Sequence, residues 1–335
     1  MQTPPKLAYV ELTLATVIIG SSVVVGKWTT EQMPVFFSQA ASLAIALLAL
    51  VPILAFRRGL SLRVTRKDVL LLIAQALLGM FLFRVFMLYG LRLVTASEAG
   101  IVTSLTPAVV AVLSYPLLRE RLSWRGALGV LCALTGVASI RMFEWISAGH
   151  AAAAASALGL LLVFAAVVGE AMLLILRKLT ASQVSSLAGT SYVILFSFLM
   201  FLPVAGAELR SFEIFSLGWR SWAVLAYNGL IITLLAYVLW FRGISRVPAG
   251  TAGVYTSIIP ISTLVLSYTL LHEPLSWIHA FGCAFVLAGV ALVSKRGTMK
   301  GSGKRQNAPR RRGEGRAVTD PSDPRYVRTE NPPHA

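Results

Sequence analysis

The chain has 335 residues, of which 56% are hydrophobic and only 13% are charged, and its mean hydropathy is +0.75. Soluble domains are about one quarter charged, so this composition predicts a membrane protein. The net charge of +16 does not indicate a nucleic-acid partner, because eleven of the thirty Lys and Arg residues follow Ser294 and nearly all the others lie between apolar runs. Two cysteines, Cys132 and Cys283, lie in apolar runs without ligand-spaced partners, which indicates packing and no metal site.

Ten apolar runs have the length of a membrane span. A spanning helix needs about twenty apolar residues, because its backbone polar groups must be paired within the segment. We therefore expect an all-α membrane protein with ten transmembrane helices, several of them joined by very short connections. The predicted spans are residues 7–26, 34–56, 69–91, 96–118, 123–142, 154–176, 184–206, 219–241, 249–271 and 276–294.

The positive charges predict the orientation. The first run is interpreted as a retained helix, because Glu11 comes early, no small-residue cleavage site follows, and a second span begins at once. Cytoplasmic loops hold the excess of Lys and Arg. With the N-terminus inside, the inner loops carry thirteen such residues before the tail, and the outer loops carry five. Both termini are expected in the cytoplasm, with the spans in the cytoplasmic (inner) membrane.

The two halves of the chain share an internal repeat. The stretch LSYPLLRERLSW at residues 113–124 returns as LSYTLLHEPLSW at residues 266–277. At the same offset of 153, residues 96–138 match residues 249–291 at 22 of 43 positions. We expect two repeats that exchange inward-open and outward-open shapes around a site near the membrane midplane.

Each repeat holds five spans, and five is odd, so the second copy must enter the membrane inverted. The loop with Arg119 and Arg121 is then cytoplasmic, and its copy with His272 and Pro274 is external, which explains the loss of both arginines. The predicted divisions are a first repeat over 1–146, a second over 147–294, and a disordered basic cytoplasmic tail over 295–335.

These repeats resemble a known family. The pattern A-x-x-A-G-x-x-T-S-x-x-P, followed by L-S-Y-x-L-L-x-E-x-L-S-W and a glycine-spaced last helix, occurs in both halves. It is similar to the EamA branch of the drug/metabolite transporter superfamily, over about residues 7–294. The resemblance implies a ten-helix secondary transporter, often an exporter of amino acids or other small metabolites, with a central cavity between the halves.

Enzymatic motifs are missing from the sequence. The tail segment Gly301–Lys304 lacks the earlier glycine and the strand of a phosphate-binding loop. No zinc-protease, serine-hydrolase or Cys/His pattern occurs, so neither an enzyme nor a cofactor is expected. A proton or substrate gradient, or facilitated flow, remains as the driving force.

Charged residues at membrane depth are functional hypotheses, because an ionised side chain there costs about 2.5–3.5 kcal/mol or more. Glu170 is either a proton carrier or cation partner, or a structural ion-pair or packing residue; similar transporters place Gly169-Glu170-Ala171 on a cavity-lining helix. Arg84 either binds a substrate carboxylate or pairs with Glu98 across a short connection. Glu11 is interpreted as an interfacial residue.

Two prolines and two glutamates recur at equivalent places. Pro107 and Pro260 each remove a backbone donor and free a carbonyl one turn earlier, which shapes packing or provides a hinge near the cavity. Glu120 and Glu273 are expected to cap the helices that directly follow them. Recurrent glycines in the fifth and tenth spans indicate close helix contact and are consistent with a homodimer seam.

Further polar and aromatic residues of the third and eighth spans are cavity candidates. Gln75 and Asn228 occupy equivalent places, and Tyr227 and Tyr237 are also at depth, whereas Trp240 is expected to anchor a helix end at the interface. Such a mixed lining suits a small amphipathic metabolite. We expect a permease of small, amino-acid-like or drug-like compounds that works by alternating access and exports them; the alternative is a non-transporting membrane sensor or assembly protein.

Overall fold

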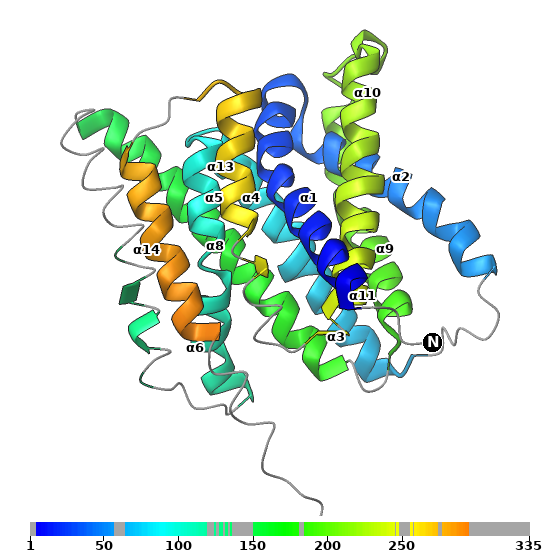
Figure 1. Cartoon of the computed structure of the whole chain (residues 1–335). Coiled ribbons are helices and arrows are strands. Elements are labelled where there is room, and N and C mark those ends of the chain that lie inside the picture. Colours follow the sequence, from blue (N-terminus) through cyan, green and yellow to red (C-terminus); the bar gives the residue numbers. More distant parts are fainter. Residues whose placement is uncertain are drawn as a thin grey trace, which may run out of the picture. The chain divides into compact units, whose positions relative to one another are not determined.

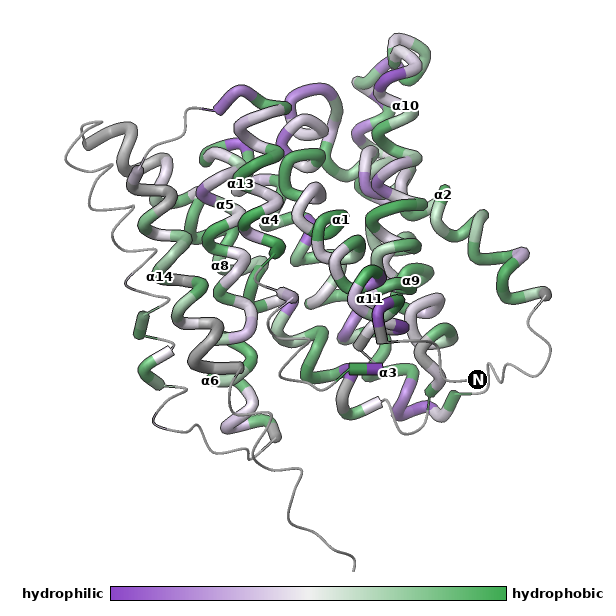
Figure 2. Tube along the Cα trace, in the orientation of Figure 1, coloured by the Kyte–Doolittle hydropathy of each residue, from purple (hydrophilic) through white to green (hydrophobic). Residues whose placement is uncertain are grey.

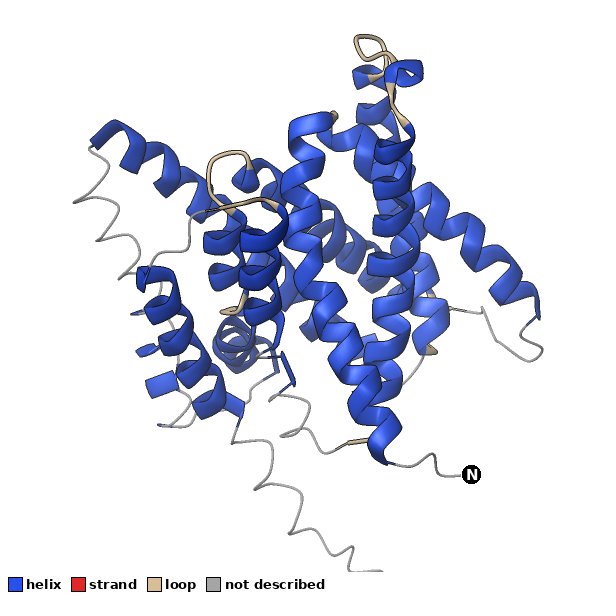
Figure 3. Ribbon diagram, turned by 45° about the horizontal axis from the view of Figure 1, so that its top comes forward, coloured by secondary structure: helices blue, strands red, loops and turns tan. Residues whose placement is uncertain are grey.

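The computed structural model describes residues 5–56, 64–118, 150–180, 184–244, 258–273 and 277–294, with a few isolated positions between them (Figure 1). Most of the predicted fifth span, Glu120 and the tail after residue 294 lie outside this part. Across the described residues the chain is helical and has no strand (Figure 3). The predicted all-α class is therefore confirmed for them.

Several predicted spans are built from more than one helical element. The unbroken helices are α1 (Pro5–Gln32), α2 (Val35–Phe56), α8 (His150–Thr180), α9 (Ser186–Glu208), α13 (Ile258–Leu270) and α14 (Trp277–Ser294). The composite spans are α3 (Arg66–Ala76), η1 (Leu77–Leu82) and α4 (Phe83–Leu91); α5 (Ala96–Thr103) and α6 (Thr106–Leu118); and α10 (Trp219–Ala226), η3 (Tyr227–Leu235) and α11 (Ala236–Ile244). A short 3₁₀ turn, η2 (Ile214–Ser216), precedes α10.

Local sequence signals explain where two of the composite spans begin. Thr65 precedes α3 and Thr95 precedes α5, and each forms a capping box with the acidic residue three positions later, Asp68 or Glu98. The carboxylate accepts the backbone N–H of the threonine, while the threonine hydroxyl accepts the N–H of the acidic residue. These bonds satisfy amide groups that the first helical turn leaves unpaired.

Seven helical stretches are long and apolar enough to cross a membrane, which makes the chain a multi-pass membrane protein. Large apolar side chains such as Leu48, Leu70 and Leu161 are more than 60% exposed, and many hydrophilic segments lie at helix ends (Figure 2). The seven correspond to the predicted first to fourth and sixth to eighth spans. The other three include residues outside the described part, so the number ten stays a prediction.

Close helix packing depends on glycines that have no room for a side chain. Helix α1 packs between α13 and α11, α2 packs against α9, and α4 packs against α8 (Figure 1). A Cβ on Gly20 of α1 would lie 2.7 Å from the Ile259 carbonyl oxygen, and one on Gly169 of α8 would lie 2.5 Å from that of Leu78. Since water is absent from the hydrocarbon core, such close van der Waals packing holds the helices together.

The third and eighth spans share an irregularity, because each contains a π-helical segment. The segments are η1 and η3, and adding the repeat offset of 153 to η1 gives 230–235, which lies within η3. Thr233 donates its hydroxyl to the carbonyl of Asn228, five residues earlier, at 2.8 Å. Because π-helical turns are rare and often occur at functional sites, these segments direct attention to the interior around them.

The prediction that Glu273 caps its own following helix was wrong. Its carboxylate accepts hydrogen bonds from the N–H groups of Ala96 and Ser97 at 2.7 and 3.1 Å, and also from the hydroxyls of Ser97 and Ser267. Glu273 therefore caps the first turn of α5, which belongs to the other half of the chain. The negative charge lies where a helix N-terminus favours it.

We expect Glu273→Gln to lower the thermal midpoint of the purified protein by about 2–4 °C at pH 7, equivalent to about 1 kcal/mol. Burial raises the pKa of Glu273, but its hydrogen bonds with Ser267, Ala96 and Ser97 lower it, and the net pKa lies below the usual value. The stabilisation is thus present above the unfolded pKa and is lost as pH falls through the folded pKa.

The difference in midpoint between the wild type and Glu273→Gln should consequently shrink between pH 7 and pH 4. Glu213→Gln is the matched control, because Glu213 is exposed and its side chain caps no helix. An equal difference at both pH values would contradict the capping role of the ionised carboxylate.

Candidate functional site

A cavity of about 390 Å³ lies among α1, α4, α5, α6, α8, α11, α13 and α14. Its wall is mainly apolar and includes the aromatic rings of Phe83 and Trp240. Five lining residues carry a hydroxyl group, namely Ser22, Thr103, Ser104, Thr106 and Thr256. Among the described lining residues, Glu170 is the only one that carries a charge when ionised.

Glu170 reaches this cavity because α8 packs closely on η1. Gly169, directly before it, lies against the Leu78 backbone, and any side chain there would force α8 away. The Oε2 atom of Glu170 accepts a 2.7 Å hydrogen bond from the Thr106 hydroxyl, and the side chain retains intermediate exposure. The predicted candidate therefore has a neutral partner and lies on the wall of an internal space.

The cavity is lined by equivalent positions of the two copies of the repeat. Thr103 has Thr256 as its counterpart, Thr106 has Ile259, and all four residues line the space. Pro107 lies in the first turn of α6, directly after the break between α5 and α6. The predicted break at this hinge candidate is thus observed. Pro260 occupies the first turn of α13, where proline is tolerated.

Arg84 does not pair with Glu98, and this part of the prediction was wrong. Its two terminal nitrogens donate to Gln39 Oε1 at 2.6 Å and to Thr233 Oγ1 at 2.8 Å. Glu98 is buried at the start of α5, where it takes part in the capping box with Thr95. The guanidinium therefore links α4 to α2 and η3, which connects the two halves of the chain.

Tyr237 lies within electrostatic range of both Glu170 and Arg84. The structure thus brings three of the predicted candidates into one interior region, although Arg84 and Tyr237 do not line the described cavity. Opposite charges in an environment of low dielectric constant interact over longer distances than in water.

The other candidates lie apart from this cavity. Gln75 is buried and donates to Thr180 at the end of α8, and within the described part of the chain its Oε1 atom lacks a hydrogen-bond partner. The Tyr227 hydroxyl lies 2.9 Å from that of Ser21, which ties η3 to α1. The Asn228 backbone carbonyl accepts from Thr233. Gln75 and Tyr227 thus link neighbouring helices, whereas the contact of Asn228 lies within η3.

Trp240 was expected only as an anchor at the membrane interface, and the structure shows that it also lines the cavity. Thr106 and Gln39 were missed. The sequence signal that could have identified Thr106 is its place directly before a proline inside an apolar run. A helix broken at the proline leaves the threonine hydroxyl and a nearby backbone carbonyl free to bond other groups. Gln39 carried no comparable signal, because a single amide in a long apolar span does not reveal which helix it faces.

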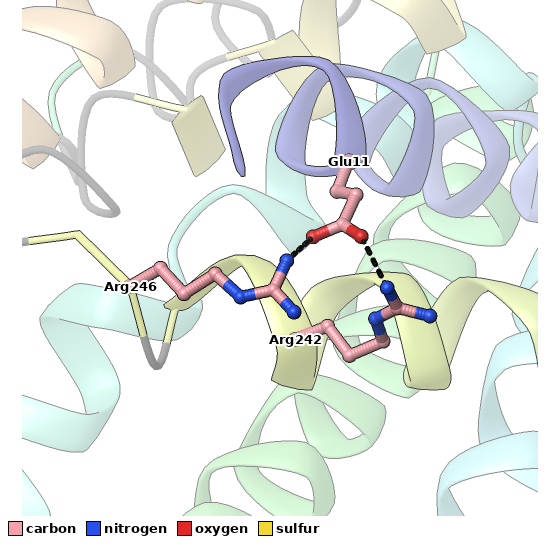
Figure 4. A network of polar contacts seen from close by, with 3 residues as sticks. All are labelled: Glu11, Arg242 and Arg246. Carbon is pink, nitrogen blue, oxygen red and sulfur yellow. Dashed lines mark hydrogen bonds and ion pairs between the residues drawn. The ribbon is translucent and has the colours of Figure 1, made fainter. Parts of the chain in front are cut away.

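A second charged cluster joins α1 to α11. The buried Glu11 carboxylate lies 3.1 Å from Arg242 and 2.8 Å from Arg246 (Figure 4). The Glu11 side chain is 7% exposed, whereas those of Arg242 and Arg246 are 54% and 29% exposed. Glu11 is thus a buried ion-pair residue with two cationic partners, unlike Glu170. Its place at the membrane interface stays a prediction.

We expect Glu11→Gln to destabilise the protein by about 1–3 kcal/mol, because two neighbouring guanidinium groups lose their carboxylate. Combined with Arg246→Gln, the loss should be smaller than the sum of the two single losses, as measured by thermal unfolding in detergent in a double-mutant cycle. The more exposed Arg242, changed to Gln, is the matched comparison and should couple more weakly. Additive losses at both positions would contradict this view of the cluster.

Comparisons with known proteins agree with the resemblance noted in the repeats. A model of the EamA-like transporter family matches residues 6–142 and again residues 157–295. A protein of Bacillus subtilis (strain 168) named "Uncharacterized transporter YetK" is 40% identical over 285 residues, which are 84% of this chain and 85% of that protein. A crystal structure with 22% identity and a TM-score of 0.59 covers 85% of this chain and 96% of that one, which supports the fold alone.

A more distant relative carries a more specific name. It is the "Probable terminal-alkyne amino-acid exporter" of Streptantibioticus cattleyicolor, 26% identical over 220 residues, which are 65% of this chain and 70% of that protein. The expectation that the chain is not an enzyme stays a prediction, while the relatives are named as transporters. With a family model matched over most of its length and with its apolar helices, the chain is a membrane transporter that belongs to the EamA-like transporter family.

Proposed function

We propose that the protein is a secondary transporter that moves a small organic, amino-acid-like or drug-like solute by alternating access. Glu170 carries this proposal, because its carboxyl group lies on the wall of an interior cavity with a neutral hydrogen-bond partner. An ionisable group at membrane depth is costly unless function maintains it. Glu170 either exchanges a proton with the solute or binds a cationic group of it directly.

Inverted repeats over 1–146 and 147–294 are the second part of the proposal. They are supported by packing that has a counterpart in the other half. The third span packs on α8 and α9, as the eighth packs on α1 and α2. The cavity lies where equivalent residues of both halves meet, such as Thr103 and Thr256. Alternating access needs such a pair of related halves around one site.

Orientation and direction complete the proposal. Both termini face the cytoplasm, as the excess of positive charge in the corresponding loops favours, and the spans lie in the inner membrane. Export is supported by the relative that is named as an amino-acid exporter. A non-transporting sensor remains the second candidate. The contacts of Arg84 favour the sensor, because its guanidinium is already bonded inside the protein to Gln39 and Thr233. The cavity beside Glu170 favours the transporter, because it leaves room for a solute.

The decisive experiment uses purified protein in liposomes that enclose a pH-sensitive dye, with amino acids and related metabolites added outside in turn. We expect one class of solute to produce proton movement in the wild type and none in Glu170→Gln, because the amide cannot carry a proton. Glu213→Gln is the matched control, since Glu213 is exposed and lies outside the cavity.

Equal passage of labelled solute in the wild type and Glu170→Gln, without proton movement in either, would make Glu170 structural and the protein a uniporter or exchanger. If no solute crosses in any variant, the sensor function is favoured instead.

A further inference from the structure

The Thr106 hydroxyl lies between two acceptors and can serve only one of them at a time. Its oxygen is 2.7 Å from Glu170 Oε2 and 2.8 Å from the backbone carbonyl oxygen of Thr103. A hydroxyl group has a single proton to donate and two lone pairs that accept. Both short contacts can be full two-centre hydrogen bonds when Glu170 is protonated and donates to Thr106, which in turn donates to Thr103. When Glu170 is ionised, the two acceptors must share the one proton of Thr106 or compete for it.

Ionisation of Glu170 reverses this chain of hydrogen bonds. The carboxylate can only accept, so the Thr106 hydroxyl must turn to it. The Thr103 carbonyl then loses that donor. Its usual helical donor would be the backbone N–H of the residue four positions later, but that residue is Pro107, which has none. The ionised state therefore leaves a carboxylate and a carbonyl acceptor close together, at residues that line the cavity.

Two acceptors beside an apolar wall match one type of chemical group. A primary ammonium has three N–H donors and one positive charge, so it can donate to the carboxylate and to the carbonyl at once. The cavity includes the rings of Phe83 and Trp240, which suit an apolar body and attract a cation. The described lining has no Lys or Arg that would repel an ammonium.

From this geometry we infer that Glu170, Thr106 and the Thr103 carbonyl form a binding site for the primary ammonium group of an amphipathic amine, and that this ammonium and the proton on Glu170 exclude one another. The inference rests on the proposed transport function and specifies its solute. Binding releases one proton from the Glu170 carboxyl group to water and places one cation beside the resulting carboxylate. The site thus exchanges one positive charge for another, and its net charge is unchanged.

Other charged groups near α8 do not replace Glu170 in this exchange. Tyr237 of α11 is within electrostatic range of it. Arg84 of α4 is bonded to Gln39 and Thr233. The remaining titratable groups on the helices that pack against α8 lie at helix ends or on the exposed surface. They are Arg66, Lys67 and Asp68 on α3, Tyr89 on α4, Glu98 on α5 and Tyr115 on α6.

The test measures binding in detergent, because neutral amines cross lipid bilayers without a transporter. Calorimetry with 2-phenylethylamine, its N,N,N-trimethyl analogue and 2-phenylethanol compares three ligands of similar body. We expect the primary amine to bind with release of up to one proton and to weaken about tenfold per pH unit once Glu170 is mostly protonated. The trimethyl analogue, which has no N–H, and the alcohol, which has no charge, should each bind at least about tenfold more weakly.

Three variants separate the parts of the site. Glu170→Gln should abolish proton release and weaken the primary amine about tenfold or more, whereas Thr106→Ser, which keeps the hydroxyl, should bind like the wild type. Pro107→Ala restores an N–H that can occupy the Thr103 carbonyl, so it should weaken the primary amine and leave the trimethyl analogue unchanged. Pro203→Ala, in α9 away from the cavity, is the matched control.

The inference is overturned if the primary amine binds without proton release and with unchanged affinity at every pH tested, if it does not bind at all, or if the trimethyl analogue binds equally well. An unchanged affinity in Pro107→Ala would also overturn the role of the carbonyl. These failures differ from failure of the transport function. If solutes without an amino group move together with protons in liposomes, the transport function is supported and the amine site is contradicted. If amines bind with proton release but no solute moves, the amine site is supported and the transport function is contradicted.

Discussion

The hydrocarbon core of a membrane offers no water to an unpaired backbone group, and the rest of this structure depends on that constraint. It makes every described span helical, because a helix pairs its own amide and carbonyl groups within the segment. It also limits where the helices can be irregular. Within the described spans, the regular pattern is lost at the break between α5 and α6 and at the π-helical segments η1 and η3. The break lies at the cavity wall, where side chains can complete the backbone hydrogen bonding.

The same constraint accounts for the different surroundings of the Glu11 and Glu170 carboxyl groups. Glu11 has two arginines close to its oxygens, so its charge is neutralised within the protein, and it ties α1 to α11. Glu170 has the hydroxyl of Thr106, which can act as donor or acceptor and so accommodates either charge state. A fixed ion pair suits a structural joint, whereas a neutral, reversible partner suits a group that changes its proton or ligand.

Contacts between the two halves are made by polar groups set into apolar helices. Arg84 joins α4 to Thr233 of η3, and Glu273 caps α5 from the far end of the chain. Each such bond is strong where water is excluded and costly to leave unmade. Because these bonds cross between the repeats, a change in the relative position of the halves must exchange them for others.

The sequence alone determined the membrane class, the positions of the described spans, the internal repeat, the family, the break at Pro107 and Glu170 as the leading candidate. These features depend on hydropathy, on local backbone chemistry and on letters that recur. The tertiary structure decided that Arg84 bonds to Gln39 and Thr233, that Glu273 caps α5, and that Trp240 lines the cavity. The reason is physical: in a lipid environment nearly every face of a helix is apolar, so hydropathy does not mark which face meets which neighbour. The packing of small residues and the pairing of a few distant polar groups decide that choice.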